Sequence, residues 1–101
     1  MAYEKALAAL ADPTRRAVLE SLRGGGRSVG EIAATLPVSR PAVSQHLKAL
    51  KQAGLVQDEA RGTARIYRIH ADGLRDLRDW LDGFWGDALA SFKNYAEGED
   101  Q

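Results

Sequence analysis

The stretch from Ser39 to Leu50 constrains the fold of this chain most strongly, because it predicts a helix with a fixed beginning and a fixed buried face. The hydroxyl of Ser39 can cap the helix by accepting a hydrogen bond from a backbone N–H that has no helical partner. Pro41 falls in the first turn, where its missing N–H costs nothing. Apolar residues then recur at positions i, i+4 and i+7, which are Val43, Leu47 and Leu50. We therefore expect this helix to be held against a core along one narrow stripe.

The opposite side of the same predicted helix is polar and carries no carboxylate. The residues that point away from the apolar stripe are Pro41, Gln45, Lys48 and Gln52, with Ser44 and His46 on its flanks. Amide and hydroxyl groups suit the edges of bases, and an ammonium group suits phosphate. This surface therefore favours double-stranded DNA as a partner.

A shorter helix is predicted directly before this one. Ser28 and Glu31 have the S-x-x-E spacing of a capping box, and Pro37 ends the helix that they open. Only Pro37 and Val38 separate that helix from the cap at Ser39. Two short helices joined by so tight a turn predict a helix-turn-helix at about residues 28–53.

A basic β-hairpin is predicted after the helix-turn-helix. Gly54 suits the left-handed end of the helix, and the segments 55–59 and 65–70 have the composition of two strands. Gly62 lies in the turn between them, and the hairpin carries Arg61, Arg65 and Arg68. A basic hairpin in this position indicates the wing, at about residues 55–70, of a winged helix. The predicted fold class is mainly α with a small β-hairpin, with five helices and a two-stranded wing.

The two ends of the chain predict helices at about residues 3–11 and 72–96, the second capped by Asp72. The last helix carries more apolar and aromatic surface than so small a core can bury, so we expect the terminal helices to pair with those of a second copy. Gly83 and Gly86 indicate a close neighbour or a local bend. A ligand pocket is the alternative role for the aromatic stripe. The residues assigned to the dimer interface are Leu7, Leu10, Leu77, Trp80, Leu81, Phe84, Trp85, Ala88 and Phe92.

Length and charge narrow the class of protein further. The 101 residues suffice for one domain with one modest core, and the formal net charge is zero. The distribution is uneven, because residues 13–70 hold ten Lys and Arg against four Asp and Glu, whereas residues 71–101 hold three against eight. A basic centre and an acidic last helix predict separate DNA-facing and solvent-facing surfaces. We expect a cytoplasmic protein with no membrane partner, since neither a signal peptide nor an apolar span is apparent.

The sequence contains few residues that could catalyse a reaction or bind a metal ion. The chain has no Cys and only two His, so thiolate sites are excluded and a metal site would need carboxylates. Ser44 and His46 are two residues apart, which on a helix turns their side chains roughly 200° from one another. We therefore predict no enzyme, no bound metal and no cofactor.

Four motifs in this order resemble those of the ArsR-type winged-helix repressors, over nearly the whole chain. They are the run Ala9–Arg16, the pattern Ser39-x-Pro-x-Val-Ser-x-His-Leu-x-x-Leu50, the run Ala53–Val56, and Arg61-Gly62 before Tyr67-Arg68. The resemblance implies a homodimer that represses transcription by placing two recognition helices on an inverted-repeat operator. It also implies DNA contacts by Ser39, Arg40, Ser44, Gln45, His46 and Lys48, and by Arg61 and Arg65 in the wing.

The chain departs from this family at the metal-sensing positions. Residues 29–33 replace the thiolate pair that metal-sensing members carry on the third helix, and the last helix has no His. The resemblance is therefore to the branch that does not sense metals, with an unknown small molecule as a possible effector. The alternative function is a protein-interaction winged helix that docks a partner through its last helix and does not bind DNA.

Overall fold

Hydrogen bonds at three helix beginnings divide the first half of the chain into short helices. The side chain of Asp12 accepts from the backbone N–H of Thr14 at 2.8 Å and of Arg15 at 3.2 Å. Ser28 and Glu31 form the predicted capping box, and Ser39 accepts from the N–H of Ala42 at 3.3 Å. Each cap satisfies a donor that the helix itself leaves without a partner. The predicted cap positions at Ser28 and Ser39 are confirmed.

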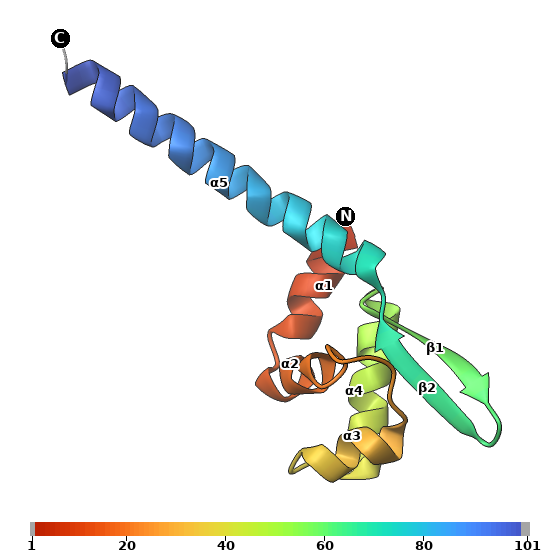
Figure 1. Ribbon diagram of the computed structural model, residues 1–101. Helices are drawn as coiled ribbons and strands as arrows, with labels where there is room; N and C mark the ends of the chain where they lie inside the picture. Colours follow the sequence, from red (N-terminus) through yellow and green to blue (C-terminus); the bar gives the residue numbers. More distant parts are fainter. Residues whose placement is uncertain (1, 100–101) are drawn as a thin grey trace.

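The computed structural model describes residues 2–99, which form five helices and one antiparallel hairpin (Figure 1). This arrangement confirms the predicted winged helix-turn-helix fold. In chain order the elements are α1 (Ala2–Leu10), α2 (Pro13–Glu20), α3 (Val29–Thr35), α4 (Arg40–Gln52), β1 (Val56–Arg61), β2 (Ala64–Ile69) and α5 (Ala71–Glu99).

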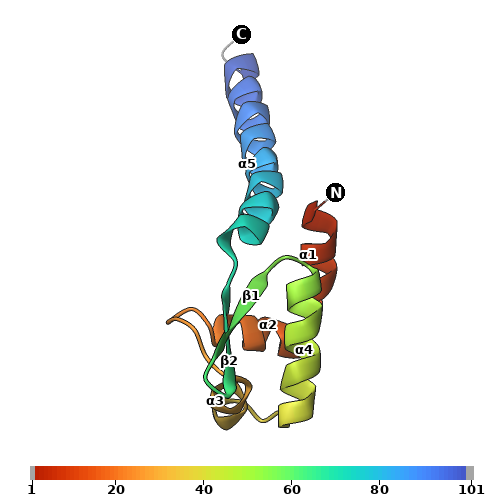
Figure 2. The same cartoon turned by 90° about the vertical axis from the view of Figure 1, so that its right-hand side faces the viewer.

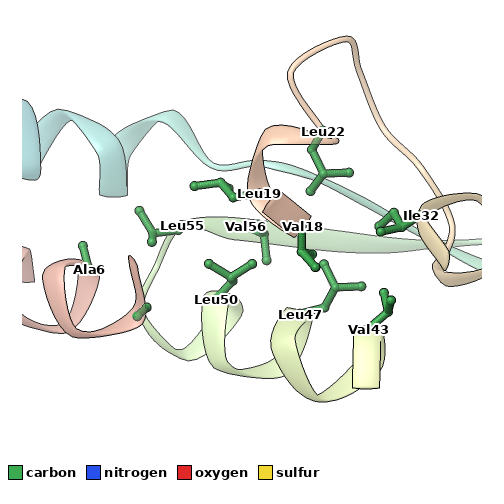
Figure 3. Close-up of a cluster of buried hydrophobic side chains, with 11 residues drawn as sticks. Ala6, Val18, Leu19, Leu22, Ile32, Val43, Leu47, Leu50, Leu55 and Val56 are labelled. Atoms are coloured by element: carbon green, nitrogen blue, oxygen red, sulfur yellow. The ribbon is translucent and has the colours of Figure 1, made fainter. Parts of the chain in front are cut away.

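One apolar core joins the first four helices to the hairpin (Figure 3). Val43, Leu47 and Leu50 are fully buried, as their spacing predicts. The other buried apolar residues are Ala6, Ala9, Val18, Leu19, Leu22, Ile32, Leu55 and Val56. Burying each Val, Leu or Ile side chain contributes about 1.5–3 kcal/mol relative to leaving it in water. The core therefore holds α4 from behind, as the sequence predicts.

Helix α1 faces the core with alanines. Ala6 and Ala9 are buried, whereas Leu10 packs partly against the same core and Leu7 remains 38% exposed. Of the two leucines of α1 predicted for the dimer interface, Leu7 is therefore exposed and Leu10 is half-buried. Small side chains at the two buried positions allow α1 to approach the core closely, and they give no apolar signal as strong as leucine.

A short segment before α3 pairs with β2 and so connects the hairpin to the helices. Strands β1 and β2 pair in antiparallel register with Asp58 opposite Tyr67, and Gly62 in the turn has φ +62°. Arg27 and Tyr67 exchange two backbone hydrogen bonds of 2.9 and 2.8 Å, which joins the segment before α3 to β2. Strand β1 begins at Val56, one residue later than predicted, because the N–H of Leu55 donates to the carbonyl of Leu50 at the end of α4.

Helix α5 begins at Ala71, so Asp72 lies in its first turn and is not its N-cap, which corrects the sequence-based prediction. The helix continues to Glu99, beyond the predicted end at residue 96. It projects far from the other elements in both views (Figures 1 and 2), and the molecule measures 69 × 24 × 23 Å. Within the described residues, nothing lies within 4 Å of a Cβ built at Gly83 or Gly86. Among those residues, no helix is both long and apolar enough to cross a membrane.

The beginning of α5 is fixed by close backbone packing. A Cβ added at Gly73 would overlap the carbonyl oxygen of Gly54, which lies in the turn between α4 and β1 with φ +78°. The local sequence around Gly73 gives no sign of this contact, because Gly54 lies in a distant segment of the chain. The contact matters for function because it joins the last helix to the end of α4.

We predict that Gly73→Ala destabilises the protein by about 1–3 kcal/mol, because overpacking forces the backbone apart at this contact. Thermal unfolding followed by circular dichroism measures the change. Gly98→Ala is the matched control, since its Cβ meets nothing within 4 Å in the described residues and alanine favours a helix. An unchanged melting temperature for Gly73→Ala would contradict the close packing.

Candidate nucleic-acid interface

Helix α4 is packed on one side and exposed on the other. Helices α2 and α3 pack against its buried stripe, and strand β1 follows directly after it (Figure 1). Six of the residues predicted to meet DNA are exposed in the described structure: Ser39, Arg40, Pro41, Ser44, Gln45 and Lys48. Gln45 and Lys48 lie three residues apart and so share one side of the helix. The fold therefore presents an amide and an ammonium group together on a helix that itself contains no Asp or Glu.

His46 differs from these neighbours because it is only half exposed. Its Nδ1 atom is buried and has no hydrogen-bond partner within the described residues. The backbone N–H of Arg15 donates a bond that lowers the pKa of Asp12, and an electrostatic interaction with His46 contributes to the same shift. His46 therefore lies toward the beginning of α2, at the edge of the exposed face of α4.

The side chain of Arg40, at the beginning of α4, lies beside α3. A Cβ added at Gly30 on α3 would come within 3.0 Å of the guanidinium of Arg40. The absence of a side chain at Gly30 thus provides the space in which this guanidinium lies. The local sequence gives no sign of this contact, because the two residues belong to different helices.

One carboxylate links the end of α4 to the wing. Asp58 on β1 forms ion pairs with Lys51 of α4 at 2.7 Å and with Arg65 of β2 at 3.2 Å. The hydrogen bond from Lys51 is the main cause that lowers the pKa of Asp58 below its ordinary value. Arg65, which the resemblance assigns to DNA, is thus held by an acidic neighbour in this structure.

The other wing arginines meet a second carboxylate. Glu59 accepts from Arg68 at 2.6 Å and lies 3.5 Å from the guanidinium of Arg61. The three arginines of the hairpin are apparent in the sequence, whereas their ion pairs with Asp58 and Glu59 of β1 become apparent only in the structure. The strand register places Glu59 opposite Ile66, so Arg68, two residues further along β2, lies on the same side of the hairpin as Glu59.

The predicted dimer interface divides into two parts. Trp80 stacks on Tyr3 of α1 at 5.1 Å between ring centroids, so this side of Trp80 is covered within its own chain. Leu77 and Leu10 are also half-buried. Beyond Trp80, exposed apolar side chains continue along α5; the large ones are Leu81, Phe84, Trp85, Leu89, Phe92 and Tyr95, with Ala88 also exposed.

Clusters of metal ligands are not found in the described residues. Nowhere in residues 2–99 do three or more His, Asp or Glu side chains gather closely enough to hold a metal ion. His70 lies 3.7 Å from Asp72 at the beginning of α5, and no third ligand joins this pair among the same residues.

The fold and the exposed face of α4 define a helix-turn-helix protein, and the sequence comparison agrees. Residues 10–59 match the family described as a helix-turn-helix domain. The HTH-type transcriptional regulator Rv2034 of Mycobacterium tuberculosis is 52% identical over 99 residues, which cover 96% of this chain and 92% of that protein. The transcriptional repressor SdpR of Bacillus subtilis is 38% identical over 76 residues, covering 75% of this chain and 84% of that protein.

A solved structure extends the similarity to three dimensions. The homodimeric winged helix-turn-helix DNA-binding domain of Mb0332 from Mycobacterium bovis, described as a possible ArsR-family regulator, has a TM-score of 0.69 at 32% identity. The similarity covers 85% of this chain and 79% of that one. The chain belongs to the ArsR-type winged helix-turn-helix transcriptional regulators. Two predictions are thereby confirmed: the chain belongs to this family, and it is a transcriptional regulator and not an enzyme.

We predict that Gln45→Ala and Lys48→Ala affect DNA binding differently. An amide can pair with two atoms of an adenine edge, so losing Gln45 should weaken the preferred site by about 1–3 kcal/mol and random DNA much less. Losing Lys48 should weaken all duplexes alike and flatten the salt dependence by about one unit of log–log slope. Titrations of specific and random duplexes at several salt concentrations measure both effects. Equal losses on both duplexes for both variants would contradict these roles.

Proposed function

We propose that this protein is a homodimeric repressor that binds an inverted-repeat operator in the cytoplasm and does not respond to metal ions. The observation that carries the proposal is the exposed face of α4, on which Gln45 and Lys48 lie opposite a fully buried stripe. This helix contains no Asp or Glu, so no carboxylate within it repels phosphate. Recognition helices of this fold enter the major groove, where amides and cations meet base edges and phosphates.

The apolar side of α5 supports the homodimer. Phe92 is 70% exposed and Trp85 69%, although both lie on a long helix with ordinary polar residues on its other side. So many large apolar groups in water are typical of an interaction surface. A second copy is the partner that the fold favours, because two recognition helices must be held at a fixed separation to bind both halves of an inverted repeat. The homodimeric domain of Mb0332 supports the same assignment.

The acidic character of α5 fits a helix that points away from DNA. Residues 71–101 carry eight Asp and Glu against three Lys and Arg, and the helix projects away from α3 and α4 (Figure 2). Phosphates would repel such a helix if it approached the duplex. We therefore assign DNA contact to α4 and the wing, and subunit contact to α5 and α1.

Control of repression is proposed to come from the dimer equilibrium or from an organic effector. We place such an effector between the terminal helices, beside Trp80 and Trp85. Tyr3 covers one face of Trp80, and Phe84 contacts Trp80 edge-on at 4.9 Å between centroids. An effector would therefore reach Trp85 more easily than Trp80, since Trp85 is 69% exposed.

We predict that the protein retards random duplex DNA in a gel at low salt and releases it at moderate salt, because phosphate contacts dominate nonspecific binding. EDTA or low micromolar zinc should leave the affinity unchanged. A protein-interaction winged helix, which is the alternative function, would retard no duplex at either salt concentration. That result would overturn the proposed function, and a tenfold change of affinity with zinc would overturn the metal-independent part of it.

We predict that Leu81→Asp gives a monomer or an insoluble protein, because an unpaired charge is costly where the interface excludes water. Light scattering at micromolar concentration measures the change against a dimeric wild type. Asp82→Asn is the matched control, since Asp82 pairs with Arg78 on the polar side of α5 at 3.6 Å. A stable wild-type monomer in the same measurement would contradict the proposed dimer.

A further inference from the structure

The wing contains nearly as many carboxylates as cations, and they are paired. Arg61 is the last residue of β1, and Arg65 and Arg68 lie on β2, while both carboxylates, Asp58 and Glu59, lie on β1. Every one of the three guanidinium groups lies within 3.5 Å of one of these two carboxylates. The hairpin is therefore much less positive toward DNA than its arginines suggest.

The two carboxylates lie on opposite sides of the hairpin. Side chains alternate along a strand, so Asp58 shares a side with the buried Val56, whereas Glu59 points the other way. The side chain of Asp58 is 7% exposed and that of Glu59 is 53% exposed. A phosphate can therefore approach the arginines around Glu59, but it can hardly replace Asp58.

Asp58 accordingly has a structural role. It holds Lys51 at the end of α4 and Arg65 on β2 at the same time, with distances of 2.7 and 3.2 Å. This contact fixes the wing relative to the recognition helix. Arg65 is then a residue that positions the wing in this structure.

We propose that Glu59 is an affinity-limiting residue of the wing, which holds Arg61 and Arg68 and competes with DNA phosphate for them. The inference rests on the proposed function, because it concerns the same DNA-binding surface. Exposed ion pairs are weak and are screened by salt, so phosphate can displace the carboxylate when the wing meets a duplex. Glu59 itself then lies beside phosphate and repels it. Both effects lower the affinity for every duplex, independently of its sequence.

The direct test is Glu59→Gln in the full chain, titrated with a random duplex over a range of salt concentrations. The variant should bind about three- to tenfold more tightly at low salt, and its salt dependence should be steeper by roughly one unit or more of log–log slope, because freed arginines displace further counterions. Glu97→Gln is the matched control. Glu97 is also an exposed carboxylate, paired with Lys93 at 4.0 Å but far along α5, and its loss changes the net charge equally.

A double variant separates the proposed mechanism from a general change of charge. In an Arg68→Gln background, Glu59→Gln should give a much smaller gain in affinity than it gives in the wild type, because the cation that Glu59 holds is then absent. Glu59→Ala, with a melting temperature measured for each variant, provides a second substitution should the glutamine variant fold poorly. The inference is overturned if Glu59 variants bind DNA no more tightly than Glu97→Gln, or if they gain affinity for one sequence only. Failure of the wild type to bind any duplex at low salt overturns the proposed function instead.

Discussion

Burial of one stripe of α4 sets the orientation of this helix and, through it, the positions of the wing and of α5. Val43, Leu47 and Leu50 are fully buried against α2, α3 and the hairpin, so the orientation of the helix about its own axis is fixed. The exposed side then has a defined composition, with Gln45 and Lys48 directed outward. The wing and α5 are attached at the end of this helix, through Leu55 and through the close approach of Gly73 to Gly54. Rigid placement of α4 therefore determines where every other proposed contact lies.

Features that depend on local sequence were predicted well. The caps at Ser28 and Ser39, the stripe of α4 and the turn at Gly62 each follow from residues within a few positions of one another. Contacts between distant segments cannot be predicted in this way, because a single sequence gives no signal for them. The pairing of Arg27 with Tyr67 and the packing of Gly73 on Gly54 are of this kind.

The wing shows why a candidate site is harder to predict than a fold. Its arginines were apparent in the sequence, but their electrostatic effect depends on the strand register that brings Asp58 and Glu59 beside them. Burial then separates the two carboxylates into one that fixes the wing and one that phosphate can reach. The same reasoning divides the interface residues, since Trp80 is stacked within its own chain while Phe92 remains in water.

Selection of bound DNA from a random pool tests the central claim most directly, which is that two copies of α4 recognise one duplex. We expect an enriched symmetric sequence whose two half-sites are centred about one helical turn, or a multiple of it, apart. Adenine is expected at the position that Gln45→Ala no longer selects. An asymmetric single site, or no enrichment from a pool that the protein demonstrably binds, would contradict it.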